Sequence, residues 1–194
     1  MKRFLFLIIT LFSILLLSCT PSDTKIIEKI DKLYNDNEGY ETTLKMKIIN
    51  DSKETIYKMK EKYIRNDVIS LEILEPAESQ GITIEYKDDK IFLNHASIRQ
   101  SISLKTVKDF DKGVLLANFF ENLNTVKTIE KREIDGNDYY IIEYSPDKKN
   151  KYNNERLIYL KKKNLEPYKM EIKDSDGITR VIIEYINFNY TKEI

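Results

Sequence analysis

The sequence predicts an α+β fold in a single domain: a curved antiparallel sheet of about 10–11 strands with two covering helices. Three observations lead to this prediction. From residue 40 onward, most segments alternate apolar and polar residues with a period of two, which is typical of half-buried strands. Short polar turns join these segments, as expected between antiparallel neighbours. Two segments, 24–34 and 114–123, instead repeat apolar residues at helical spacing.

The first half of the domain is expected to contain one helix and about six strands. Asp23 or Thr24 can cap the helix by accepting hydrogen bonds from its first turn. The helix should end at 35–39, where we expect Gly39 to take a positive φ. Its apolar face comprises Ile26, Ile27, Ile30, Leu33 and Tyr34. The strands are expected at 40–48, 57–63, 69–73, 82–86, 91–93 and 98–104.

The second half begins with the helix at 114–123, which is apolar over much of its circumference and should pack onto the sheet or into its concave side. The last strand changes face, because apolar residues share one side over 181–185 and the other side over 186–190. A β-bulge would produce this slip, but two shorter strands or a strand buried on both faces also would. The strands are expected at 125–134, 139–144, 156–160, 167–172 and 178–190.

The first residues have the three-part order of an export signal: a basic start at 1–3, an apolar run at 4–17 and small Ser18. The run is about 14 residues long, whereas a helix needs ~20 residues to span a bilayer. The segment Leu16-Leu17-Ser18-Cys19 resembles the lipobox of bacterial lipoproteins, and Cys19 is the only cysteine. A plain secreted protein or an uncleaved membrane helix is the alternative.

The lipobox resemblance implies three parts: a signal peptide at 1–18, a lipidated tether at 19–23 and one domain at 24–194. A diacylglyceryl group on Cys19, with acyl chains such as palmitate, would hold the domain on the extracytoplasmic face of the cell membrane. The chain has 32 basic and 32 acidic side chains, and loss of Lys2 and Arg3 with the signal peptide leaves a net charge of −2. No basic excess favours nucleic acid as a partner.

Candidate catalytic and metal-binding residues form no recognisable motif. His95, the only histidine, is expected in a surface turn near Ser97, Ser101 and Ser103, without the glycines of a nucleophile elbow. Zinc would need three or four ligands, mostly His or Cys. We therefore expect no enzyme activity, no metal and no cofactor. A hydrolase with a convergent catalytic site is kept as a hypothesis beside the two binding functions described below. The acidic pairs lie at turns, where Asp is favoured for backbone reasons: Asp88/Asp89, Asp109/Asp111, Asp135/Asp138 and Asp174/Asp176.

Tyrosines and lysines are the residue types that could serve a binding surface. Most of the 13 tyrosines fall in expected strands, where they suit both sheet packing and a protein interface. Both faces are apolar at 139–144, so one face could meet a partner or a second copy of the chain in a homodimer. The lysines at 148–151 and 161–163 are interpreted as solvated turns or as contacts to anionic lipid or wall polymer.

The element order resembles that of the LolA/LolB-like lipoprotein superfamily, in which helices cover the concave face of an open half-barrel. The local similarity lies in 64–76, 81–86 and 88–93, with Pro76 between two strands. The lipobox and a composition rich in Lys, Ile, Asn and Tyr, typical of an AT-rich genome, make the chain most similar to the clostridial spore germination lipoproteins (GerS-like). No arginine matches the lid-locking arginine of the soluble carriers, since all lie in strand-like contexts: Arg65, Arg99, Arg132, Arg156 and Arg180.

The resemblance implies a non-catalytic, membrane-anchored lipoprotein that binds and supports an envelope protein partner. By this resemblance the partner is a spore cortex-modifying amidase of the N-acetylmuramoyl-L-alanine type, needed for germination, and its binding residues are unknown. The alternative is a lipid- or lipoprotein-binding receptor or carrier with an apolar cavity under the helices. A deep cavity on the concave face would favour lipid, and a filled one would favour a protein partner.

Overall fold

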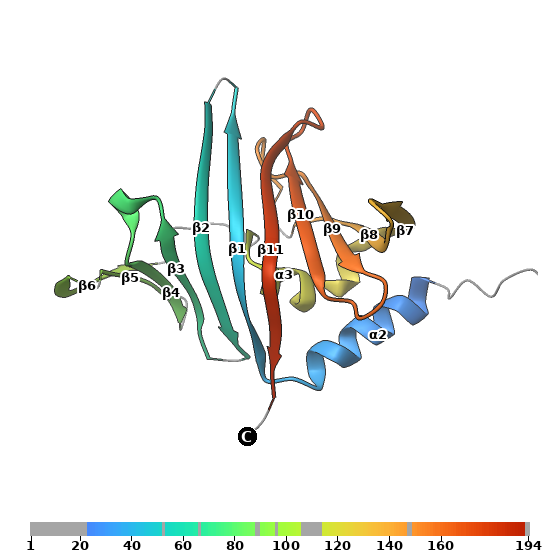
Figure 1. Ribbon diagram of the computed structural model, residues 1–194, viewed down its shortest axis with the longest axis horizontal. Helices are drawn as coiled ribbons and strands as arrows, with labels where there is room; N and C mark the ends of the chain where they lie inside the picture. Colours follow the sequence, from blue (N-terminus) through green and yellow to red (C-terminus); the bar gives the residue numbers. More distant parts are fainter. Residues whose placement is uncertain are drawn as a thin grey trace, which may run out of the picture.

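The computed structural model describes residues 23–192, apart from 52, 66, 88–89, 96, 106–113 and 147–148. Eleven strands in this part of the chain form one sheet in the order β6-β5-β4-β3-β2-β1-β11-β10-β9-β8-β7. The first strand, β1, lies at the centre of the sheet, and the following strands run outward to β6 at one edge. The chain then continues at the opposite edge with β7 and returns strand by strand until β11 pairs with β1 (Figure 1). All ten pairings between neighbouring strands of the described chain are antiparallel, as the sequence predicts.

Every strand expected from the sequence is present, with ends that differ by a few residues. The strands are β1 (Gly39–Asn50), β2 (Lys53–Ile64), β3 (Ile69–Glu75), β4 (Ile82–Lys87), β5 (Lys90–His95), β6 (Ile98–Lys105), β7 (Val126–Ile134), β8 (Asn137–Tyr144), β9 (Glu155–Lys161), β10 (Pro167–Lys173) and β11 (Thr179–Thr191). The helical elements are α2 (Asp23–Asn35), η1 (Ala77–Ser79), α3 (Leu116–Glu121) and η3 (Leu123–Thr125).

Helix α2 lies on the inner face of the sheet with its predicted apolar side buried. Ile26 and Ile30 are almost fully buried in the main core. The end of the helix is held by side chains: the Asn37 amide donates to the Leu33 carbonyl at 2.7 Å, and the Arg65 guanidinium donates to the carbonyls of Tyr34 and Asn37. These bonds satisfy carbonyl groups that have no partner within the helix.

Gly39 corrects one expectation from the sequence. It begins β1 and is not among the residues with a positive φ, so it does not end the helix in the left-handed conformation. A Cβ atom at this position would lie 2.0 Å from the carbonyl oxygen of Tyr63 on β2. Glycine is therefore required because the two strand backbones approach closely.

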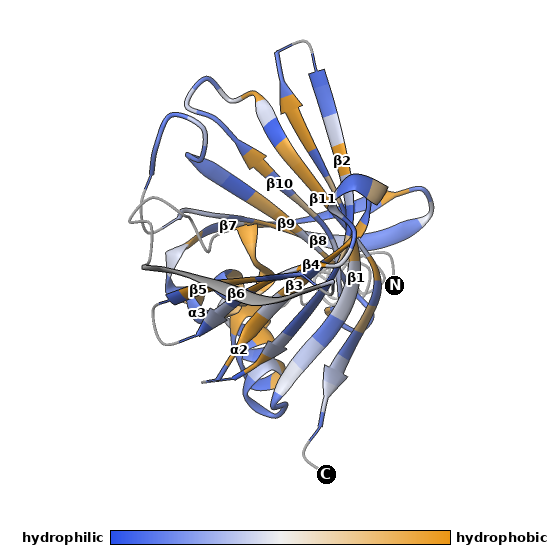
Figure 2. Cartoon of the chain, turned by 90° about the vertical axis from the view of Figure 1, so that its left-hand side faces the viewer, coloured by the Kyte–Doolittle hydropathy of each residue, from blue (hydrophilic) through white to orange (hydrophobic). Residues whose placement is uncertain are grey.

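The second helix is shorter than the predicted 114–123. Helix α3 spans Leu116–Glu121 and gives way to η3 because Asn122 leaves the helical conformation, with φ −122° and ψ 36°. The Asn122 side chain donates to the Asn118 carbonyl at 2.9 Å, which is the local competition with backbone bonding that disfavours Asn inside helices. In Figure 2 the apolar parts of α2 and α3 lie inside the curve of the sheet.

The change of face in the last strand is a β-bulge, as one of the sequence alternatives predicted. Thr43 pairs with Asn187 but Leu44 pairs with Tyr185, so Ile186 is an extra residue on β11. The extra residue returns the apolar side chains beyond it to the inner face, where Phe188 and Tyr190 pack against the core. Ile186 itself is 54% exposed.

Candidate functional site

The predicted lipidation residue, Cys19, lies outside the described residues, as do the predicted signal peptide at 1–18 and the rest of the tether up to residue 22. Among the helices that the structure describes, none has the length and apolar character needed to cross a membrane. Lipidation and the division into signal peptide and tether stay predictions.

His95 is the last residue of β5 and pairs with Ile82 and Ile98, so it is a strand residue and not the turn residue that was expected. Its Nδ1 atom accepts the backbone N–H of Ser97 at 3.2 Å and lies 2.8 Å from the Ser97 hydroxyl. This pair spans the short β5–β6 turn. The side chains of Ser101 and Ser103 lie outside the described part of β6.

The acidic pairs that the structure describes serve the turns in which they lie. The Asp174 carboxylate is 2% exposed and accepts the backbone N–H groups of Asp176 and Ile178, each at 2.9 Å. It also accepts Arg180 Nε at 2.6 Å, whereas Asp138 pairs with Lys162. The pairs Asp88/Asp89 and Asp109/Asp111 lie outside the described residues. Within the described chain, no group of three or more His, Cys, Asp or Glu side chains could hold a metal ion.

The inner face carries a buried carboxyl group that the sequence analysis missed. Glu61 on β2 is fully buried, and its Oε1 atom accepts the Tyr40 hydroxyl at 2.6 Å. The backbone N–H of Leu116, at the start of a helix whose N-cap, Leu115, has no side-chain cap, also favours the charged form of the carboxyl. The Oε2 atom of Glu61 is buried and has no hydrogen-bond partner. Burial raises the pKa of Glu61 to about 7, because removal from water penalises the charged form more than these bonds stabilise it.

A second buried charge, Arg156 on β9, lies on the other side of the same helix. Its Nη1 atom donates to the Asn118 side chain at 2.8 Å, and its Nε donates to Asn153 at 3.0 Å. The guanidinium lies 5.7 Å from the centre of the Tyr144 ring. The predicted strand context of this arginine is correct, but its side chain contacts α3 and does not face solvent.

The burial of both charged residues could have been recognised from the alternation of apolar and polar residues along β2 and β9. Glu61 lies in register between the core residues Met59 and Tyr63, and Arg156 is two residues before buried Ile158. A charge at an apolar-face position is costly unless it has partners. Such positions therefore indicate an internal polar network, although the sequence does not reveal that the partner is α3.

The space beneath α3 is filled by aromatic rings. Phe119 and Phe120 are 0% and 3% exposed. The Phe119 ring lies 5.1 Å from that of Tyr144 in an edge-on contact, and the Phe120 ring stacks at 5.1 Å on that of Tyr34. These rings pack between α3 and the sheet, so another apolar group could enter at this position only by displacing them.

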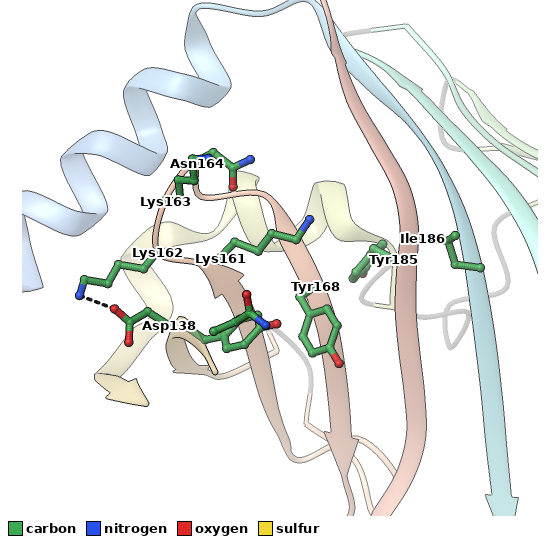
Figure 3. A pocket seen from close by; sticks show the side chains of 10 residues that line it. Asp138, Lys161, Lys162, Lys163, Asn164, Tyr168, Tyr185 and Ile186 are labelled. Atoms are coloured by element: carbon green, nitrogen blue, oxygen red, sulfur yellow. Dashed lines mark hydrogen bonds and ion pairs between the residues drawn. The ribbon is translucent and has the colours of Figure 1, made fainter. Parts of the chain in front are cut away.

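The outer face, which α2 and α3 leave uncovered, carries a second apolar cluster. Strand β8 is apolar on both sides, as predicted, since Tyr140 and Ile142 join the main core whereas Tyr139 and Ile141 pack outward with Tyr159. Beside this cluster lies an open hollow of about 790 Å³ (Figure 3). Its lining comes from the start of β8, the β9–β10 hairpin, β10 and the bulge of β11.

Together these features define a class of protein: a curved antiparallel sheet with helices on its inner face, in which the candidate sites are surfaces for binding. The sequence matches the sporulation protein YdcC-like family over residues 1–194, and the chain belongs to this family. Among curated protein sequences, none matches the chain significantly.

Solved structures share the fold over most of the chain. An uncharacterised conserved protein from Thermus thermophilus has a TM-score of 0.57 and 9% identity, covering 89% of this chain and 90% of the other. A chain in the complex of the CwlD amidase with the GerS lipoprotein from Clostridioides difficile has a TM-score of 0.52 and 22% identity, covering 88% and 97%. A LolA superfamily protein from Nitrosomonas europaea has a TM-score of 0.48 and 17% identity, covering 90% and 96%. At these identities the likenesses with a TM-score above 0.5 show a shared fold, which agrees with the GerS-like resemblance expected from the sequence.

Proposed function

We propose that this chain is a non-catalytic lipoprotein of the spore envelope that binds and supports an enzyme partner at the membrane surface. The partner would be an amidase of the N-acetylmuramoyl-L-alanine type that modifies the cortex and is needed for germination. The diacylglyceryl group on Cys19 would hold the complex to the extracytoplasmic face of the membrane, because two acyl chains give stable attachment.

One observation carries the proposal: the similarity in fold to a chain of the complex between the CwlD amidase and the GerS lipoprotein, which extends over 97% of that chain. Membership of a sporulation family supports the same cellular setting. Because that complex joins an amidase and a lipoprotein, an amidase is the first partner to test.

The close packing of the described residues beneath α3 supports a protein partner over a lipid ligand at that position. An acyl chain beneath α3 would have to displace the buried rings of Phe119 and Phe120. It would also lie against the buried polar groups Glu61 and Arg156, and it would break the hydrogen bond from Arg156 to Asn118 of α3 without replacement. These costs oppose the carrier alternative.

The test is affinity purification of the tagged full-length chain, in detergent, from sporulating cells. We expect an amidase to co-purify, and mass spectrometry of the same sample to find no stoichiometric lipid apart from the one on Cys19. The matched control is an unrelated lipoprotein with the same tag and signal peptide. Recovery of bound lipid in place of any envelope enzyme would contradict the proposal and support the carrier alternative.

A further inference from the structure

The two halves of the outer sheet face differ in chemistry. On β1 and β2 this face carries charged side chains, including the ion pairs Lys60–Glu41 and Lys47–Glu54. On β8, β9 and β10 it carries the apolar cluster of Tyr139, Ile141, Tyr159, Ile134, Leu157 and Tyr168. A sheet face without a covering layer is ordinarily polar. Tyr139, Ile141 and Tyr159 are buried by their neighbours on this face, so the apolar area open to a partner is that of the half-buried members of the cluster.

The hollow beside this cluster has the shape of a binding site for a protruding segment. Its volume of about 790 Å³ is large enough for several side chains. Its floor includes the rings of Tyr139 and Tyr168, whose centres lie 4.8 Å apart. Tyrosine rings are rigid and amphipathic, and they lose little conformational entropy when a partner covers them.

The β-bulge supplies an apolar anchor at the opposite wall. Ile186 lines the hollow and is 54% exposed, because the register shift leaves it as the unpaired extra residue of β11. An exposed aliphatic side chain at a concave site gains free energy when a partner covers it. Bulges commonly direct side chains toward functional surfaces in this way.

The charge around the hollow specifies the chemistry of the occupant. Three lysines, Lys161, Lys162 and Lys163, line it against one carboxylate, Asp138. Figure 3 shows the Lys161 side chain extending along the face that carries the Tyr168 ring. Lys161 and Lys162 form exposed ion pairs with Glu166 and Asp138, which are weak and can exchange partners. An arriving carboxylate would therefore be attracted at this rim.

We infer that the outer-face hollow is the docking surface for the protein partner, and that it accepts a protruding segment that carries a carboxylate beside an apolar or aromatic side chain. The inference rests on the proposed function and adds to it the location and chemistry of the contact. A concave site with aromatic walls fits such a segment, whereas a flat membrane surface could reach only the rim lysines.

The test uses the full-length chain in detergent and the amidase encoded in the same genome, with binding measured by surface plasmon resonance. We expect the double change Lys161→Glu and Lys163→Glu to weaken binding roughly tenfold or more, and Tyr168→Ala or Ile186→Asp to do the same, as for other interface anchors. The matched control, Lys45→Glu and Lys60→Glu, changes two lysines on the other half of the outer face and should leave the affinity unchanged. Circular dichroism checks that each variant is folded.

The outcomes separate the two proposals. Amidase binding that survives all the hollow variants would overturn the inference and leave the proposed function standing. Absence of amidase binding by the unmodified chain would overturn both. Binding to vesicles rich in phosphatidylglycerol that is lost in the lysine variants, with amidase affinity intact, would overturn the inference in favour of a membrane contact. Loss of self-association in the hollow variants, seen by analytical ultracentrifugation with amidase affinity intact, would overturn it in favour of a homodimer.

Discussion

Replacement of Glu61 by glutamine should remove a specific pH dependence of stability. The folded protein holds the pKa of this carboxyl at about 7, against an ordinary value of 4.5. The folded state therefore retains the proton to higher pH than the unfolded chain does. The contribution of this carboxyl to the free energy of unfolding is fully present below pH 4.5, falls as the pH rises toward 7, and does not change further above that.

The size of the effect follows from the pKa difference. A rise from 4.5 to about 7 corresponds to about 3 kcal/mol in total, and roughly 2–3 kcal/mol of it falls between pH 5 and pH 8. Glutamine has nearly the same shape and can still accept the Tyr40 hydroxyl, but it does not titrate. Groups that titrate in both proteins cancel in the difference.

The assay is urea unfolding of the native protein and of Glu61→Gln at pH 5, 6.5 and 8. The chain has no tryptophan, so circular dichroism and tyrosine fluorescence report the transition. We expect the variant to gain roughly 2–3 kcal/mol relative to the native protein between pH 5 and pH 8. Glu184→Gln, an exposed change on the outer face of β11, is the control and should show no such gain. A native-to-variant difference that stays constant within about 0.5 kcal/mol across this range would refute the reasoning.

Three further predictions concern other sites. Gly39→Ala should cost about 1–3 kcal/mol, since its Cβ would lie 2.0 Å from a β2 carbonyl oxygen. Gly177→Ala, which has a φ of +77° but open space around it, should cost only about 1 kcal/mol in the same thermal melts. Arg156→Met should leave Asn118 and Asn153 without their donor and speed hydrogen exchange in α3 at least tenfold, while exchange in α2 changes little; equal acceleration in both helices would contradict a local role. Cys19→Ala should abolish acylation and leave the precursor uncleaved or release the protein; a membrane-bound product of acylated mass would argue against the lipobox assignment.

The strand pattern could be predicted from the sequence because side chains alternate locally along any strand that has one face in the core. The β11 bulge could be predicted for the same reason: an extra residue shifts the alternation, and the slip between Tyr185 and Ile186 is visible in the letters. The length of the second helix was overestimated because its apolar pattern continues past Asn122. The side chain of that residue bonds locally and ends the helix.

The roles of Glu61 and Arg156 were out of reach of the sequence. Their positions in the alternation indicate burial, but their partner is a helix segment that lies 55 residues after Glu61 and 38 residues before Arg156. The hollow could not be predicted either, because its lining residues are distant in the sequence and run from Asn137 on β8 to Ile186 on β11. Only the pairing of four neighbouring strands brings these residues to one surface.

The sequence by itself determined the order of helices and strands and the antiparallel meander, and it predicts lipidation at Cys19, because each depends on residues that are near one another along the chain. The tertiary structure decided why Gly39 is glycine, which charged residues lie against α3, and where a tyrosine cluster packs on the outer face of the sheet. These depend on contacts between distant segments, which form only when the sheet curves and β11 pairs with β1. A local pattern can state that a side chain is buried, but it cannot state against what.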